Sequence, residues 1–154
     1  MIALPLAPLW ILGYLSSLTV VVLSLLSLRL SYRLMAQDPE KRSFLSAEMR
    51  SQMRSIIHAA YQAGWLQLAF LTVGDEKAAG YLNFDYAGHI WVYNSGLDYK
   101  FRDLSPGWVL LGYLLQWANE HQRRAFDFMR GDEEYKYRFG AVDRRVVRAT
   151  VRRG

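Results

Sequence analysis

Two short stretches in the second half of the chain carry the residue types that could do chemistry. The first, Leu104–Gly107, has the composition of a helix start, because Ser105 is a favourable N-cap residue and Pro106 suits the first helical turn. Unpaired N–H groups at a helix N-terminus can hold an anion. The amides of Ser105, Gly107 and Trp108 are therefore candidates for binding a phosphate or a carbonyl oxygen.

The second stretch is a short apolar strand that contains a single carboxylate. Asp127 stands between Phe126 and Phe128, and a carboxylate is costly to bury in such surroundings without a partner. Two interpretations remain open. Asp127 either forms a buried ion pair, with Arg130 or Arg138 as partner, or acts as a general base or amine anchor whose pKa is raised by burial.

A sheet with flanking helices is predicted to position these stretches. Apolar runs between turn residues predict three successive antiparallel strands, at residues 65–73, 78–86 and 89–94. The weak alternation of the middle strand indicates that both of its faces are covered. A polar turn at Ser95–Asp98 follows, and the helix beginning at Ser105 leads to a buried strand at residues 125–129.

The predicted fold class is α/β (α+β), with a mixed, mostly antiparallel sheet. Strand, capped helix, strand and charged turn is the layout of a ligand site at the end of a parallel strand pair. An amphipathic helix is predicted at residues 43–63 and ends at Gly64, a typical residue after a helix C-terminus. Residues 142–151 are predicted to form a final edge strand whose arginines protect the edge from association.

The same residues carry a resemblance to a known family. The Ser95–Asp98 turn, the helix start at Leu104–Gly107 and the block Phe126–Asp132, with Tyr135-Lys136 behind it, resemble the C-terminal half of the CelD-like (BioF2-like) acyltransferase domain. This domain is a branch of the GNAT fold related to FemAB-type transferases. The resemblance covers about residues 44–140, and it implies a partial GNAT-like domain whose front half is replaced by an apolar segment.

The resemblance implies acyl transfer from a coenzyme A thioester, acetyl-CoA or another, to an amine or hydroxyl acceptor, without a metal. Such an enzyme supplies orientation, N–H donors, a base for the amine and an acid for the leaving thiolate. Tyr135 stands where GNAT-type enzymes often place that acid, although it could equally be an aromatic packed under the last helix. Asp127 could be the base, and Asp98 could be an acceptor contact or only a turn former.

The donor's phosphates have two candidate partners under the same resemblance. Arg130 and Lys136 could bind them, or could pair only with the neighbouring acidic residues Asp132, Glu133 and Glu134. The cofactor-binding residues implied are therefore Ser105, Gly107, Trp108, Arg130 and Lys136.

Other chemistries are excluded by what the sequence lacks. There is no cysteine, which rules out disulfides, thiolate metal sites and a cysteine nucleophile. GxSxG, HExxH, Walker and GxGxxG motifs are absent, and His58, His89 and His121 lack the spacing of metal ligands. His58 is interpreted as structural, because it is a lone histidine beside the apolar stripe of its helix.

The net charge of +5 belongs to one end of the chain. Residues 1–143 hold fourteen basic and fourteen acidic side chains, and the surplus is five arginines, Arg144, Arg145, Arg148, Arg152 and Arg153. Such a tail can bind nucleic acid or acidic lipid headgroups, or it can simply be solvated. The neutral body argues against a dedicated nucleic-acid-binding protein.

Residues 2–28 contain no charged side chain. In a helix this run is roughly 40 Å long, at about 1.5 Å per residue, and exceeds the ~30 Å hydrocarbon thickness of a bilayer. Residues 9–28 are therefore a predicted transmembrane helix within an N-terminal segment at 1–35, and the GNAT-like domain is predicted at 36–154. Basic residues follow the span and none precede it, which places the domain on the cytoplasmic face of the membrane.

Two hypotheses from different classes follow. The first is a membrane-anchored acyltransferase, in which the acceptor belongs to polysaccharide or cell-envelope biosynthesis. The second is a membrane-tethered remnant without catalysis, which keeps the sheet as a binding or structural module. The helix start and the block at Asp127–Lys136 favour the enzyme, whereas the apolar run in place of the front half favours the remnant. If the N-terminal segment is an artefact, the domain is expected to be cytoplasmic.

Overall fold

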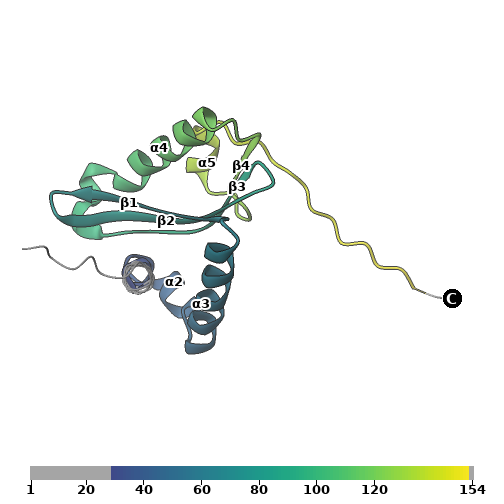
Figure 1. The fold of residues 1–154 in the computed structure, drawn as a ribbon, viewed down its shortest axis with the longest axis horizontal. Helices are drawn as coiled ribbons and strands as arrows, with labels where there is room; N and C mark the ends of the chain where they lie inside the picture. Colours follow the sequence, from purple (N-terminus) through teal and green to yellow (C-terminus); the bar gives the residue numbers. More distant parts are fainter. Residues whose placement is uncertain (1–28, 153–154) are drawn as a thin grey trace, which may run out of the picture.

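The computed structural model describes residues 29–152, and its centre is a four-stranded sheet (Figure 1). The strands have the spatial order β1-β2-β3-β4. The first three are antiparallel neighbours and β4 is parallel to β3. Their bounds are β1 Leu66–Val73, β2 Glu76–Tyr86, β3 His89–Leu97 and β4 Ala125–Asp127. The predicted fold class, a mixed and mostly antiparallel sheet with flanking helices, is confirmed.

Helices cover both faces of this sheet. Residues 29–35 are helical, and the further helices are α2 Pro39–Phe44, α3 Ala47–Gln62, the 3-10 helix η1 Tyr99–Leu104, α4 Pro106–Glu120 and α5 Glu134–Arg138. Figure 1 shows α4 and α5 on one side of the sheet and α2 and α3 on the other. The domain therefore has three layers, and the sheet is the middle one.

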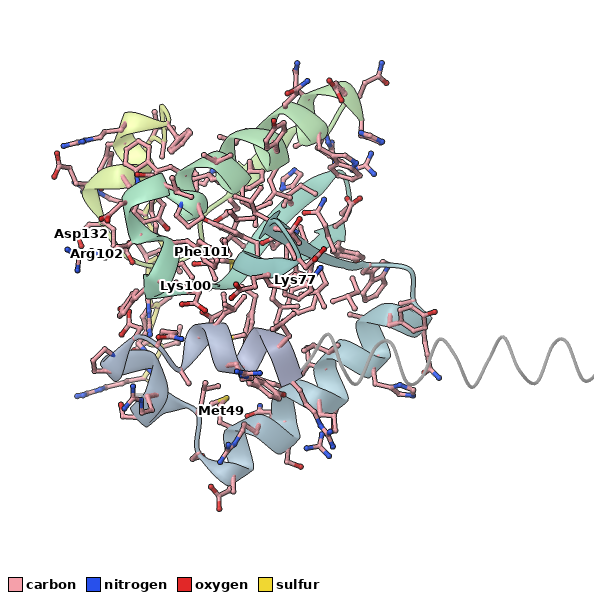
Figure 2. All side chains as sticks on the ribbon, turned by 90° about the vertical axis from the view of Figure 1, so that its left-hand side faces the viewer. Met49, Lys77, Lys100, Phe101, Arg102 and Asp132 are labelled. Atoms are coloured by element: carbon pink, nitrogen blue, oxygen red, sulfur yellow. The ribbon has the colours of Figure 1, made fainter. Side chains whose placement is uncertain are left out.

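The two faces of the sheet bury separate apolar clusters. Alternate residues of β2 point to opposite faces, so Leu82 joins one cluster and Tyr81 joins the other. The α3 side contains Met35, Leu45, Met53, Ile57 and Leu82, and the α4 side contains Ala79, Tyr81, Val92, Leu110, Leu111 and Leu114. Side chains fill the space on both sides of the sheet, and Met49 lies with the lower helices (Figure 2). The prediction that both faces of the middle strand are covered is confirmed.

A pair of glycines lets the helix at residues 29–35 approach the sheet closely. Gly80 and Gly96 are cross-strand partners in β2 and β3. A Cβ at Gly96 would lie 2.5 Å from the backbone carbon of Leu34 and 2.5 Å from the backbone nitrogen of Met35. Only a residue without a side chain fits at this position, so the close packing of this helix depends on Gly96.

Several predicted boundaries need correction. Residues 95–98 are not a turn after β3, because Ser95, Gly96 and Leu97 continue the strand and pair with β2. The helix predicted at 43–63 corresponds to α3 and begins later, at Ala47, because residues 43 and 44 are the end of α2. Its N-cap is Ser46, whose Oγ accepts the N–H of Met49 at 3.2 Å.

Residues 142–151 do not form the predicted edge strand, since they have neither helix nor strand structure. The strand predicted at 125–129 also ends early, at Asp127, because Met129 has a φ of 59°. Such a left-handed backbone does not continue a strand.

Candidate functional site

The candidate site lies where β3 loses its neighbour. β4 pairs only with His89, Ile90 and Trp91, so on this side the remainder of β3 has no strand partner among the described residues. A pocket of about 410 Å³ occupies this region, bounded by the end of β3, the start of α4 and the loop before α5. Its lining residues are Leu34, Asp38, Tyr81, Ser95, Gly96, Leu97, Tyr99, Gly107, Trp108, Leu111, Glu133 and Tyr135.

In an antiparallel pair, the main-chain N–H and C=O groups of successive residues point alternately toward the partner strand and away from it. Some main-chain groups of β3 therefore point toward the open edge. Asp98 donates its N–H to the carbonyl of Ala78 at 2.8 Å, so residues 98 and 96 point toward β2. The N–H and C=O of Ser95 and Leu97 consequently point the other way. The N–H of Ser95 is already bound by Asn94 Oδ1 at 2.8 Å. Leu97 therefore offers a donor and an acceptor along the open edge.

The start of α4 offers fewer amides than the sequence suggested. Ser105 occupies the N-cap position, but it has a left-handed backbone, φ 50°, and its side chain makes no capping hydrogen bond. Its own N–H donates to the carbonyl of Arg102 at 3.0 Å, and the N–H of Trp108 donates to the carbonyl of Ser105 at 3.0 Å. Pro106 has no N–H. The amide of Gly107, which lines the pocket, remains for a ligand.

Two tyrosines form the inner wall of the pocket. Tyr81 is 5% exposed, and burial is the main cause that raises its pKa above the ordinary value. The nearby Tyr135 adds to this rise in pKa, and a hydrogen bond with the Ser95 side chain opposes it. Burial also raises the pKa of Tyr135, followed by the charge of Glu133. Both phenols keep their protons at neutral pH, so either can donate one.

The structure places Asp127 outside the pocket lining. Its Oδ1 accepts the N–H of Met129 at 2.6 Å, across a turn that follows β4. Within the described residues, Asp127 has no basic side chain within ion-pair distance, and Arg138 pairs with Glu134 instead. The carboxylate is half-buried and serves the turn. The expected buried ion pair is therefore absent from the described part of the chain.

Lys136 is used within the protein. It is 5% exposed, its Nζ donates to the carbonyls of Arg130 and Gly131 at 3.0 and 3.1 Å, and it pairs with Glu133 at 2.6 Å. The ammonium group therefore fixes the loop that carries Glu133 into the pocket. The side chain of Arg130 is exposed and outside the lining.

Asp98 also has a local structural contact. Its Oδ1 accepts the N–H of Lys100 at 3.0 Å and caps η1, and it does not line the pocket. Of the eight residues named as site candidates from the sequence, the pocket thus brings together Gly107, Trp108 and Tyr135.

Most of the chain matches a known family. The acetyltransferase (GNAT) domain matches residues 22–137, 116 of the 154 residues. The chain belongs to this family. No curated protein and no solved structure matches it significantly. The predicted membership of the GNAT superfamily is confirmed, and acyl transfer from acyl-CoA is the general chemistry of such domains.

The match begins at residue 22, well before the resemblance read from the sequence at about residue 44. In this GNAT domain, the helix at 29–35 packs on the sheet through Gly96, and its Leu34 reaches the pocket. Between residues 29 and 152, no helix is long and apolar enough to cross a membrane, and no group of three or more metal-ligating side chains is found. The predicted span at 9–28 lies outside the described residues.

Several lining residues of this GNAT domain were not found from the sequence. Tyr81 is one of them. It lies in β2 on the same face as Ala79, and this alternation could have indicated that it faces α4. Asp38 and Glu133 are others. They precede α2 and α5 respectively, and no local pattern links two residues so far apart in the chain.

Proposed function

We propose that this chain is an acyltransferase that transfers an acyl group from a coenzyme A thioester to an amine or hydroxyl acceptor. One observation carries the proposal. In a chain of the GNAT family, the pocket joins the open edge of β3, the N-terminus of α4 and a proton-bearing Tyr135. These are the parts that direct thioester transfer needs, namely N–H donors for the carbonyl and an acid for the leaving group.

The proposed reaction is a single displacement. The acceptor nitrogen or oxygen attacks the thioester carbonyl carbon, a bond to that carbon forms, and the carbon–sulfur bond breaks. The N–H of Leu97 or Gly107 stabilises the oxyanion, and Tyr135 gives its proton to the thiolate. Glu133, the carboxylate in the lining near Tyr135, takes the proton of the acceptor. In this scheme, Asp127 and Asp98 position the backbone and do not touch the reacting atoms.

The finer features of the proposal rest on the sequence. They are a CelD-like (BioF2-like) subfamily, an acceptor from polysaccharide or cell-envelope biosynthesis, and a transmembrane helix at residues 9–28 that holds the domain on the cytoplasmic face. The tether predicts that full-length protein stays in the membrane pellet through a carbonate wash. Release by carbonate as a soluble monomer would refute the tether and leave the acyltransferase proposal intact.

One observation favours the alternative, a non-catalytic module. The pocket lining contains two carboxylates, Asp38 and Glu133, and none of its residues is Lys, Arg or His. The phosphates of coenzyme A would therefore find no cationic partner within the lining. Under the acyltransferase proposal, the phosphates extend outside the pocket, past the exposed start of α4, and only the thioester end enters.

Donor binding separates the two functions. Acetyl-, malonyl- or long-chain acyl-CoA should raise the thermal midpoint, because a ligand bound only to the folded state stabilises it. A Cβ at Gly107 would meet only Leu97 Cδ2, at 3.8 Å. Gly107→Ala should therefore bind the donor, whereas the longer side chain of Gly107→Leu fills the pocket and should abolish the shift.

The matched control is Gly112→Leu, on the same helix but outside the pocket lining, which should respond to the donor as the parent does. If none of the three thioesters shifts the midpoint of the parent, the non-catalytic module is the better account.

Transfer activity tests Tyr135. Tyr135→Phe removes the hydroxyl but preserves the ring, whose centroid lies 6.2 Å from that of Phe128, so the fold should be retained. The rate should fall roughly 10²–10⁴-fold, the usual scale for a lost acid. Donor binding should stay the same. A Phe variant with full activity would show that another group protonates the thiolate.

A further inference from the structure

The segment at residues 141–152, called here the C-terminal segment, leaves the domain after α5. It has no helix or strand structure, and Figure 1 shows it extending away from the body. A hydrogen bond from the Tyr137 hydroxyl in α5 to Asp143 Oδ1, at 2.9 Å, connects the segment to the body. The four valines of the segment are almost fully exposed, at 87% for Val142, 97% for Val146, 83% for Val147 and 92% for Val151.

The charge surplus of the protein begins in this segment. Residues 1–143 are balanced, with fourteen basic and fourteen acidic side chains, and the arginines of the segment, Arg144, Arg145, Arg148 and Arg152, are all exposed. None of these arginines forms an ion pair within the described residues. Four cations and four exposed aliphatic side chains thus alternate over eleven residues, and neither set is used by the domain.

Helical periodicity sorts these two sets onto different faces. An α-helix turns by about 100° per residue. Arg144, Arg148 and Arg152 follow at steps of four residues, and together with Arg145 they occupy an arc of about 100°. All four valines fall outside that arc, in a half of the helix surface that also contains Asp143 and Thr150. The segment would therefore be an amphipathic helix with a cationic face and an opposite face where Asp143 and Thr150 interrupt the valines, although β-branched valine disfavours such a helix in water.

We propose that the C-terminal segment binds an anionic lipid surface and folds there into an amphipathic helix. Arginines on one face then contact the phosphates of the headgroups, and valines on the other enter the acyl boundary, which provides the apolar phase that they lack in the structure. This proposal does not depend on acyl transfer or on the span at residues 9–28.

A nucleic acid accounts for fewer of the observations. Single-stranded nucleic acids are held by aromatic side chains on which bases stack, and residues 141–152 contain none. The phosphate backbone would pair with the arginines but leave the four valines exposed. In addition, the balanced charge of residues 1–143 gives no wider cationic surface along which a polynucleotide could run.

The lack of cysteine in the chain allows a local measurement. A single cysteine is introduced by Ala149→Cys, on the aliphatic side of the predicted helix, and labelled with a polarity-sensitive fluorophore. The control is Gln52→Cys, at an exposed position on α3. The full chain is mixed with phosphatidylcholine vesicles, with and without phosphatidylglycerol. The fluorophore reports only on the surroundings of residue 149. If the chain attaches to vesicles through another part, the response of the label should be the same with both vesicle types.

The Ala149→Cys label should shift to the blue only with phosphatidylglycerol vesicles, and added salt should reverse the shift. Partitioning should weaken about fivefold for each arginine replaced by glutamine, which corresponds to about 1 kcal/mol per basic residue. Replacing the four valines with serine should remove the blue shift. The label at residue 52 should not respond.

Three results would overturn the proposal. They are an unchanged spectrum with anionic vesicles, a blue shift retained after all four arginines or all four valines are replaced, and a response to single-stranded RNA without one to vesicles.

Discussion

Gly96 gives the sharpest test of the described packing. A Cβ at this position would lie 2.5 Å from the backbone of Leu34 and Met35, whereas ordinary contacts begin at 3.4 Å. The helix at residues 29–35 must therefore move by about 0.9 Å, the difference between these two distances, in Gly96→Ala. Backbone atoms cannot rotate away as a side chain can. Overpacking of this kind costs about 1–3 kcal/mol.

The cost should appear in thermal or urea unfolding. For a chain of this size, 1 kcal/mol corresponds to roughly 2–4 °C, so the midpoint of Gly96→Ala should fall by about 2–12 °C. Gly112 provides the matched control, because a Cβ there meets nothing within 4 Å. Gly112→Ala lies in the interior of α4 and should gain about 1 kcal/mol from helix propensity. Equal midpoints for the two alanine variants would refute the close contact between this helix and β3.

Three further predictions concern the surroundings of the pocket. Lys136→Met should destabilise the protein by about 1–3 kcal/mol, because the carbonyls of Arg130 and Gly131 lose part-buried hydrogen bonds from an ammonium group and Glu133 loses its ion pair. Unchanged urea unfolding would contradict this role. Asp127→Asn keeps an acceptor for the Met129 N–H, so its free energy of unfolding should stay within about 0.5 kcal/mol of that of the parent. Asp127→Ala loses this acceptor and should be less stable by about 1 kcal/mol. Equal losses of stability for the two variants in urea unfolding would show that the carboxylate charge matters. Burial raises the pKa of Tyr135 above that of the unfolded chain, about 10. The contribution of this raised pKa to the free energy of unfolding is therefore complete below pH 10 and is lost as pH rises through the folded-state pKa of Tyr135. Between pH 9 and pH 11, the free energy of unfolding should fall less for Tyr135→Phe than for the parent.

The strands could be predicted because their signals are local. Apolar runs bounded by turn residues placed β1 to β3 close to their observed limits, and the turn at Ala87-Gly88 has the positive φ values that such a hairpin needs, 53° and 75°. The parallel return to β4 followed from the helix between the strands. These features depend on neighbours in the sequence.

Gly96 shows why the remaining features could not be predicted. In the sequence, Ser95-Gly96-Leu97-Asp98 has the composition of a turn, and glycine is the usual turn residue. In the structure, Gly96 is within a strand because a helix from much earlier in the chain packs directly on its backbone. A glycine can indicate a turn or a close approach, and only the identity of the distant neighbour distinguishes them. The pocket depends on the same approach, since Leu34 lines it.

The position of the pocket also follows from the end of β4. Had the strand continued to Met129, as its apolar residues suggested, it could have paired further along β3 and closed the edge that now borders the pocket. It ends because Asp127 accepts the N–H of Met129, whose φ of 59° turns the chain away. Phe128 then contacts Tyr135, edge to face, and helps to fix that phenol. The carboxylate of Asp127, a candidate ion-pair partner or base from the sequence, is thus connected to the pocket through the backbone. Removal of this acceptor should alter the fit of the donor and should not directly affect proton transfer. Asp127→Ala should therefore weaken donor binding, whereas Asp127→Asn should not.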